Sequence, residues 1–165
     1  MANASTLEYK DCVRDATVES FSMLCGMEIT LEGVGTERSA SESSIVAVIF
    51  ILGDVEWSVI VNLPKESAEA IAPKFAGFEI PFDSEDMGDA VGELCNIVAG
   101  AVKAKLDGLG KRAEISLPSV MRGSSVQVLS YKGLPIAIFN FASECGSFAI
   151  EVVGSPDVVP TKKVV

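Results

Sequence analysis

The stretch SIVAVIFILGDVEWSVIV, residues 44–61, consists of two apolar runs that are separated by a Gly-Asp pair. The second run alternates apolar and polar residues, which is typical of a strand buried on one face, and Gly-Asp favours a tight turn. These features predict a β-hairpin with strands over 45–52 and 55–63. A second stretch, PIAIFNFASECGSFAIEVV at 135–153, predicts another hairpin with its turn at SECGS.

Three helices and several short strands are predicted around these hairpins. Apolar residues recur at helical spacing, with Thr6 and Ser84 at N-cap positions and Pro64 at a first turn. Glycines follow the first and third of these helices and are suited to end them. The predicted helices cover 7–25, 64–75 and 84–106, and the remaining strands cover 28–31, 114–117, 126–131, 136–141 and 148–153. The polar stretch GVGTERSASESS, which begins at Gly33, predicts a loop.

The order of these elements repeats along the chain. A helix, a short strand and an apolar hairpin occur once in each half, and either a duplicated unit or ordinary α+β ordering explains the repeat. The sequence predicts a two-layer α+β fold: an antiparallel sheet with long helices packed on one face, and internal pseudo-twofold helix–strand–hairpin units. We expect a single domain over 1–155 and a flexible tail over 156–165.

Charge and hydropathy exclude several classes of partner. The chain carries 13 basic and 23 acidic side chains, for a formal net charge of −10, and such a surface repels nucleic-acid phosphates and anionic lipids. The longest apolar run is much shorter than the roughly 20 residues that cross a bilayer. The amino-terminal stretch MANASTLEYKD lacks the pattern of a signal peptide. We therefore expect a cytoplasmic protein that binds neither nucleic acid nor membrane.

The types of side chain present limit the chemistry. The sequence has no histidine, which excludes His-based triads, His general bases and nearly all His-containing zinc sites. The four cysteines form no C-x-x-C pair, so we expect buried, reduced thiols at Cys12, Cys25, Cys95 and Cys145. Any reaction must therefore use carboxylates, amides, hydroxyls, lysines or groups of a partner.

The predicted third helix contains GELCNIVAG, which places a carboxylate and an amide on its polar side. Glu93 and Asn96 are neighbours at i, i+3 spacing. Gly92, Ala99 and Gly100 lie on the same exposed half in this prediction, where small residues let another backbone approach. The opposite, apolar stripe consists of Met87, Ala90, Val91, Leu94, Val98, Ala101 and Val102. Because E-x-x-N also arises by chance on solvated helices, the motif alone does not decide between a site and a bare surface.

Four segments together carry a family resemblance. GELCNIVAG with the following AVKAKLDGLG resembles the signature helix of the CheX branch of the CheC/CheX/FliY chemotaxis phosphatases. FSMLCGMEI resembles the end of the family's first helix, ISLPSVMRG the segment after its second signature helix, and ECGSFAIEVV its closing hairpin. These segments occur in the family's order over about 12–153. The resemblance implies a two-layer fold with pseudo-twofold symmetry and a homodimer.

The resemblance also implies an activity. Members of the family remove the phosphoryl group from the aspartyl phosphate of the response regulator CheY. By position, Glu93 would contact the regulator's lysine and Asn96 would orient the attacking water, because a neutral amide adds no negative charge near the phosphoryl oxygens. The residues expected at the partner contact are Gly92, Ala99, Gly100 and Lys103. The implied partner is a phosphorylated CheY-like regulator that holds Mg²⁺ in its own acidic pocket, so we expect no cofactor or metal on this chain.

Two positions depart from the family pattern. The first helix has Glu8 and Asp11 where two-site members carry E-x-x-N, which predicts one working site per chain. Ala101 stands where many relatives have an asparagine.

Two other hypotheses stay open: a non-catalytic regulator-binding or scaffold module of the same fold, and a small-molecule sensor with an enclosed core pocket. The edge strands of a two-hairpin sheet also favour a homodimer.

Overall fold

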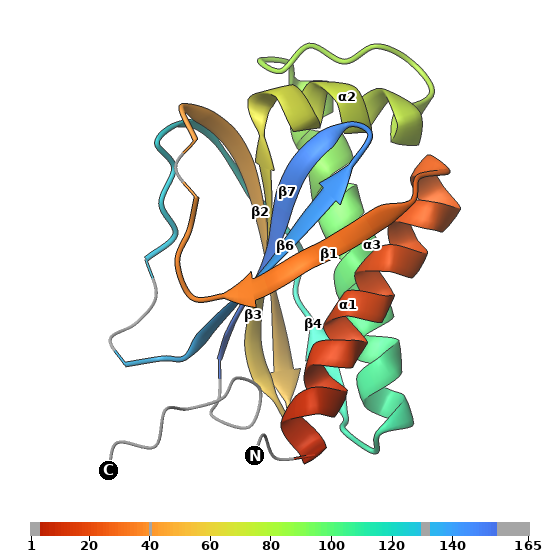
Figure 1. Ribbon diagram of the computed structural model, residues 1–165, viewed down its shortest axis with the longest axis vertical. Coiled ribbons are helices and arrows are strands. Elements are labelled where there is room, and N and C mark those ends of the chain that lie inside the picture. The colour runs from red at the N-terminus through yellow and green to blue at the C-terminus, as the bar shows by residue number, and fades with distance from the viewer. Residues whose placement is uncertain (1–3, 40, 130–132, 155–165) are drawn as a thin grey trace.

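The computed structural model describes residues 4–39, 41–129 and 133–154, which form one sheet covered by helices on one face (Figure 1). Helices α1 (Ala4–Cys25) and α3 (Glu85–Gly108) pack against each other over this inner face, and α2 (Lys65–Ala76) lies across one end (Figure 1). The predicted two-layer α+β class is confirmed. No helix within the described ranges is long and apolar enough to cross a membrane.

Within the described part of the chain, seven strands form the antiparallel sheet. They are β1 (Ile29–Gly35), β2 (Ser43–Gly53), β3 (Glu56–Pro64), β4 (Ala113–Ile115), β5 (Ser119–Ser124), β6 (Ile136–Ser143) and β7 (Gly146–Gly154). The order across the sheet is β1-β6-β7-β3-β2-β4, and β5 also pairs with β2. Both predicted hairpins, β2–β3 and β6–β7, are therefore confirmed.

The pairing of the strands interlocks the two halves of the chain. The hairpins meet at the centre through β3 and β7, where Val59 pairs with Val152. The short strand of each half then pairs with the hairpin of the other half: β1 with β6, and β4 and β5 with β2. This exchange gives the sheet the predicted internal pseudo-twofold arrangement.

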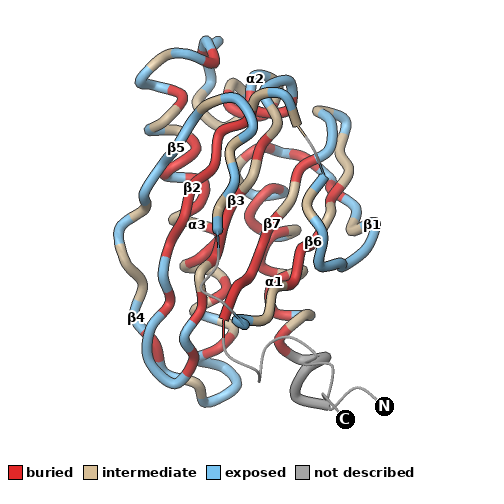
Figure 2. Tube along the Cα trace, turned by 90° about the vertical axis from the view of Figure 1, so that its left-hand side faces the viewer, coloured by how far each residue is buried: buried red, intermediate tan, exposed pale blue. Residues whose placement is uncertain are grey.

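The core lies between the inner face of the sheet and the helices. Alternate residues of the central strands point into it, as the period of two requires, and the buried strands at the centre contrast with the exposed edges (Figure 2). The Tyr9 ring meets the edge of Trp57 at 5.6 Å between centroids, and Phe21 stacks on Phe148 at 4.6 Å. These contacts attach α1 to both hairpins, so one continuous core spans both halves.

The outer face of the sheet, opposite the helices, has an apolar and a polar part. The apolar part is a cluster of Val46, Val48, Ile60 and Val153. In the polar part, Glu151 is only 1% exposed, and its carboxylate accepts hydrogen bonds from Arg38 Nε at 2.7 Å and Asn62 Nδ2 at 3.3 Å. A buried carboxylate is tolerated when it is paired in this way. Arg38, which follows β1, is thereby held against the outer face.

Some predicted boundaries are wrong. The first helix begins at Ala4, so Thr6 lies inside it and is not its N-cap. The predicted strand over 28–31 continues to Gly35, into the stretch predicted as a loop, because β1 keeps pairing with β6 beyond a bulge after Leu31. Sequence reasoning missed this extension because the partner strand lies far away in the sequence.

The strand predicted over 126–131 is also wrong over 126–129, and the rest of it lies outside the described residues. The chain pairs with β2 earlier, through β5 at Ser119–Ser124. Val126 and Val128, whose apolar alternation suggested a strand, pack instead on the outer-face cluster. The predicted tail over 156–165 lies outside the described residues, and the single domain over 1–155 stays a prediction.

Candidate functional site on helix α3

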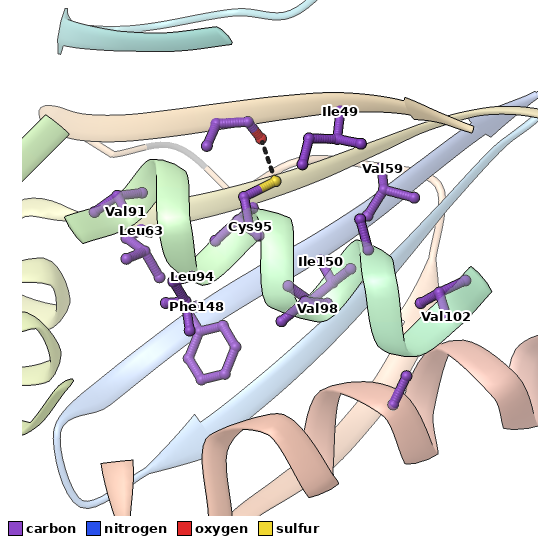
Figure 3. Packing of buried hydrophobic residues seen from close by; sticks show 14 of the residues in the cluster. Ile49, Val59, Leu63, Val91, Leu94, Cys95, Val98, Val102, Phe148 and Ile150 are labelled. Carbon is purple, nitrogen blue, oxygen red and sulfur yellow. Dashed lines mark hydrogen bonds between the residues drawn. The ribbon is translucent and has the colours of Figure 1, made fainter. Parts of the chain in front are cut away.

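Helix α3 is fixed in place by its own sequence. Ser84 Oγ accepts a hydrogen bond from the Met87 backbone N–H at 3.2 Å, which confirms the predicted N-cap. Glu85 and Asp86 follow in the first turn, where negative charge is favourable. The sheet-facing side packs into the core through Met87, Val91, Leu94, Cys95, Val98, Val102 and Leu106 (Figure 3). This packing sets which side of α3 faces outward.

The predicted pair lies on the outward side. Glu93 is exposed and Asn96 is half-buried. Among the described residues, neither side chain has a hydrogen-bond or ion-pair partner. Exposed polar side chains on a helix are commonly hydrated and need no partner within the protein. The half-buried amide of Asn96 has no partner in the described chain, so its donors and its acceptor stay available for another hydrogen bond. Both side chains are therefore accessible from outside the chain.

The prediction that Gly92 and Ala99 lie on the exposed half is wrong. Both are buried, and Ala99 is 0% exposed. The reason is that β4, β5 and the segment between them run along this side of α3. A Cβ added to Gly92 would lie 3.2 Å from Val120 Cγ2 and 3.7 Å from Pro118 Cγ, so the glycine makes room for this segment and not for a partner.

The other expected contact residues lie nearer to solvent. Gly100 is half-buried, and a Cβ there would meet nothing within 4 Å. Lys103 Nζ lies 3.2 Å from Asp107 Oδ2 in an i, i+4 ion pair. An exposed pair of this kind is weak and can open when a partner approaches. Ala101 packs, partly buried, against the core and is not part of this surface.

Cys95 lies beneath the motif, and its environment argues against a chemical role. Its thiol donates to the Ala47 carbonyl oxygen at 3.6 Å, as the dashed line in Figure 3 shows. Burial raises the pKa of Cys95 to about 12, so the reactive thiolate is not formed at neutral pH. The described residues also contain no cluster of acidic residues and cysteines that could hold a metal. Within the motif, the carboxylate of Glu93 and the amide of Asn96 are therefore the groups available for chemistry.

Arg122 of β5 ties the edge of the sheet to the start of α3. Its Nη1 donates to the carbonyl oxygens of Phe82 at 2.9 Å and Ser84 at 2.6 Å. Its guanidinium also lies 6.0 Å from the centroid of the Phe82 ring. This anchor could not be predicted from local patterns, because it depends on the register of β5 against β2. These contacts hold β5 in register with the start of α3.

The shape of the surface limits what the pair can meet. Glu93 and Asn96 project from the side of a helix, so they suit entry into a hollow of another macromolecule. The cavity beside Arg38 and Glu151, of about 220 Å³, lies at the outer face of the sheet, away from the pair. It does not provide the enclosed core pocket that the small-molecule sensor hypothesis requires.

Leu117 is a residue near the site that sequence reasoning missed. It is 88% exposed, in the segment whose Pro118 and Val120 lie against Gly92. In the sequence, Leu117 is the last residue of a predicted strand and lies within ISLPSVMRG, one of the segments that resemble the family. Such a signal does not show which surface the leucine adjoins.

Two solved structures share this arrangement of sheet and helices. The chemotaxis protein CheX from Desulfovibrio desulfuricans superposes with a TM-score of 0.79 at 24% identity, over 90% of this chain and 99% of that one. The CheX–CheY–BeF3–Mg²⁺ complex from Borrelia burgdorferi contains a chain that superposes with a TM-score of 0.72 at 23% identity, over 88% of this chain and 96% of that one. The fold is therefore of the CheX class.

Sequence comparison then places the chain in a family. The CheY-P phosphatase CheX of Thermotoga maritima is 35% identical over 101 residues, which are 59% of this chain and 65% of that protein. The match thus spans just under two thirds of that relative's length. The family model of the chemotaxis phosphatase CheX matches residues 45–142, which include the whole of α3. The chain belongs to the chemotaxis phosphatase CheX family, as its resemblance to that family predicted.

Proposed function

We propose that this chain hydrolyses the aspartyl phosphate of a CheY-like receiver domain. The observation that carries the proposal is the outward-facing, unpartnered pair Glu93 and Asn96 on α3, in a chain of the CheX family. The name of the Thermotoga relative and the complex of the Borrelia CheX with CheY support this partner. The proposal assigns roles to two side chains and leaves the choice of regulator open.

Asn96 is the proposed catalytic residue. Its amide accepts a hydrogen bond from a water and aims the water oxygen at phosphorus, in line with the acyl oxygen that leaves. A phosphorus–oxygen bond to water forms and the bond to the aspartyl oxygen breaks, which gives the free carboxylate and H2PO4⁻ with both protons of the water. An acyl phosphate is already reactive, so positioning and charge stabilisation suffice.

Glu93 is the proposed docking residue, and it lies one helical step from Asn96. A carboxylate pairs well with the lysine of a receiver domain, and this pair would set the depth at which Asn96 enters. Mg²⁺ would be held by the receiver domain's acidic pocket, so this chain needs no metal of its own. Gly100 offers open space beside the pair, and Lys103 can exchange Asp107 for an acidic group of the partner.

The test is the decay of a phosphorylated receiver domain, measured against a panel of such domains. We expect wild type to accelerate decay and Asn96→Ala to lose on the order of 10²-fold or more of that rate. Asn140→Ala is a matched control, because Asn140 is also half-buried but lies on β6 at the outer face of the sheet. Equal decay for wild type and Asn96→Ala would exclude the catalytic role.

The same assay separates catalysis from the binding-module hypothesis. A non-catalytic scaffold would bind a receiver domain in a titration and leave its dephosphorylation rate unchanged. We favour the enzyme because a scaffold does not require an unpartnered amide beside the carboxylate.

We also propose a homodimer. Strand β1 lies at one edge of the sheet, with most of its residues exposed, and β5 lies near the other edge in a similar state. Exposed edges can be covered by pairing across a twofold axis. Light scattering at micromolar concentration should give the mass of two chains, and a monomer there would contradict this assignment.

A further inference from the structure

An apolar side chain is held in the open beside the proposed active surface. Leu117 is 88% exposed, yet the backbone around it is fixed. The Ser116 backbone N–H donates to the Phe50 carbonyl oxygen, and the Phe50 N–H donates to Ser116 Oγ, each at 2.9 Å. On the other side, Pro118 and Val120 approach Gly92 of α3. Single exposed leucines are common on proteins, so the position of this one is what matters.

The chain from Arg122 back to Ser116 runs along α3 toward the motif. Arg122 is bonded to the Ser84 carbonyl oxygen, and Pro118 lies against Gly92. Extended chain advances about 3.3 Å per residue and helix about 1.5 Å, so one strand residue spans about two helix residues. Continuing this course by one residue places Leu117 about two helix residues beyond Gly92, at the start of the turn of α3 that leads to Asn96. Gly92 and Asn96 also share a side of the helix, one turn apart.

The charge beside this apolar position is acidic. Glu85, Asp89 and Glu93 follow each other at four-residue spacing along α3, and all are exposed. A shallow cavity of about 380 Å³ lies between the first of these residues and β5, and Val120, which is 37% exposed, lines it. A partner that reaches Asn96 therefore meets acidic groups on one side and apolar groups on the other.

We propose that Leu117, together with Val120, is the specificity-determining apolar contact for the receiver domain whose phosphoryl group Asn96 reaches. This inference rests on the proposed function and extends it from chemistry to partner choice. The complementary receiver domain presents an apolar side chain next to its phosphoaspartate pocket and a basic one toward Asp89. Because Leu117 touches no reacting atom, it contributes to affinity and leaves the rate of the bound complex unchanged.

The experiment is a binding titration with CheY-like receiver domains loaded with BeF3⁻ and Mg²⁺, which hold the domain in its activated form without turnover. The domain that wild type binds most tightly is used throughout. We expect Leu117→Ser to raise its Kd about tenfold or more, as removal of a buried apolar anchor does. Leu117→Met should bind like wild type. In the decay assay, Leu117→Ser should show a raised KM and a kcat within about twofold of wild type.

Leu129→Ser is the matched control. Leu129 is 84% exposed, in the segment whose Val126 and Val128 pack on the outer face of the sheet. It should bind the receiver domain like wild type. A Kd for Leu117→Ser within twofold of wild type, or an equal loss in Leu129→Ser, would overturn the proposal. Unchanged melting temperatures of both variants exclude unfolding as the cause.

The outcomes also separate this inference from the proposed function. If Asn96→Ala loses the rate while Leu117→Ser binds normally, the docking role fails and the phosphatase stands. If Leu117→Ser lowers kcat without changing Kd, Leu117 is not a docking residue. If wild type binds none of the activated domains, both proposals fail together.

Discussion

Helices α1 and α3 occupy equivalent places in the two halves of the fold, and their exposed sides differ. On α1, Arg14 pairs with Asp11 at 3.0 Å and with Asp15 at 2.8 Å. On α3, Glu93 and Asn96 have no such partners among the described residues. Asp11 and Asp15 of α1 are thus engaged within their own helix, whereas the polar pair of α3 has no partner among the described residues. The fold thus constrains the buried stripes of these helices and leaves their outer sides free to diverge.

The buried sides of the two helices also differ in composition. Thr17 and Ser20 of α1 are buried, and their hydroxyls donate to the carbonyl oxygens of Val13 and Ala16, each at 2.7 Å. Serine and threonine hydroxyls inside helices commonly form such a hydrogen bond to the carbonyl oxygen four residues earlier. On α3, the buried side is apolar apart from the thiol of Cys95. Both compositions allow a helix to pack on the sheet, so the buried sides do not account for the difference between the exposed sides.

The largest difference between the two helices is expected when one negative charge is removed from each. Glu93→Gln should raise the KM for a phosphorylated receiver domain about tenfold, because the charge-assisted hydrogen bond to the partner's lysine is lost. Asp15→Asn also removes one negative charge, in this case from α1, and should leave KM unchanged. Steady-state decay assays measure both. Equal effects of the two changes would show that general electrostatic attraction, and not docking of α3, sets the affinity.

A second prediction concerns the buried thiols of the two helices. Burial raises the pKa of Cys95 from an ordinary value of 9.0 to about 12. Burial is also the largest cause of the raised pKa of Cys25, at the end of α1, which is about 11. Above pH 9 the unfolded chain loses these protons and the folded chain keeps them, so the free energy of unfolding falls as pH rises. Each thiol contributes at most about 1.4 kcal/mol per pH unit.

The contribution of Cys25 should stop growing near pH 11 and that of Cys95 near pH 12. Thermal unfolding between pH 8.5 and 11 should therefore show a smaller loss of stability in Cys95→Ala than in wild type, although the variant starts lower because of the cavity. Parallel pH dependence of the two proteins would mean that the thiol of Cys95 is not shielded from water.

The smallest expected effect is on α1. Asp11→Asn introduces an amide three residues after Glu8, which recreates the E-x-x-N spacing on this helix. We expect less than a twofold change in the decay rate, and no recovery of activity when it is combined with Asn96→Ala. Loss of one exposed ion pair with Arg14 should change stability by at most about 1 kcal/mol. Recovery of the rate in the double variant would show that α1 can serve as a second site.

Local patterns explain why much of the fold could be predicted. The hairpins follow from period-two alternation and a turn residue, and α3 from its Ser84 cap and apolar stripe. The failures have a common cause. Burial of Gly92 and Ala99, and the position of β5, depend on a strand from elsewhere in the chain that passes along α3. Nothing local to GELCNIVAG or to ISLPSV reports that contact, so the outward position of Glu93 and Asn96 could be predicted from helix periodicity and the segment packed beside them could not.

The exchange of short strands between the halves has a consequence for how the protein is made. Ile29 of β1 pairs with Ser143 of β6, so during synthesis β1 waits for a strand from far along the chain before it gains its neighbour in the sheet. Contacts so distant along the chain close slowly. Until β6 has been made, β1 therefore has no strand to pair with. A gene cut between the halves should yield two fragments that become structured only when they meet.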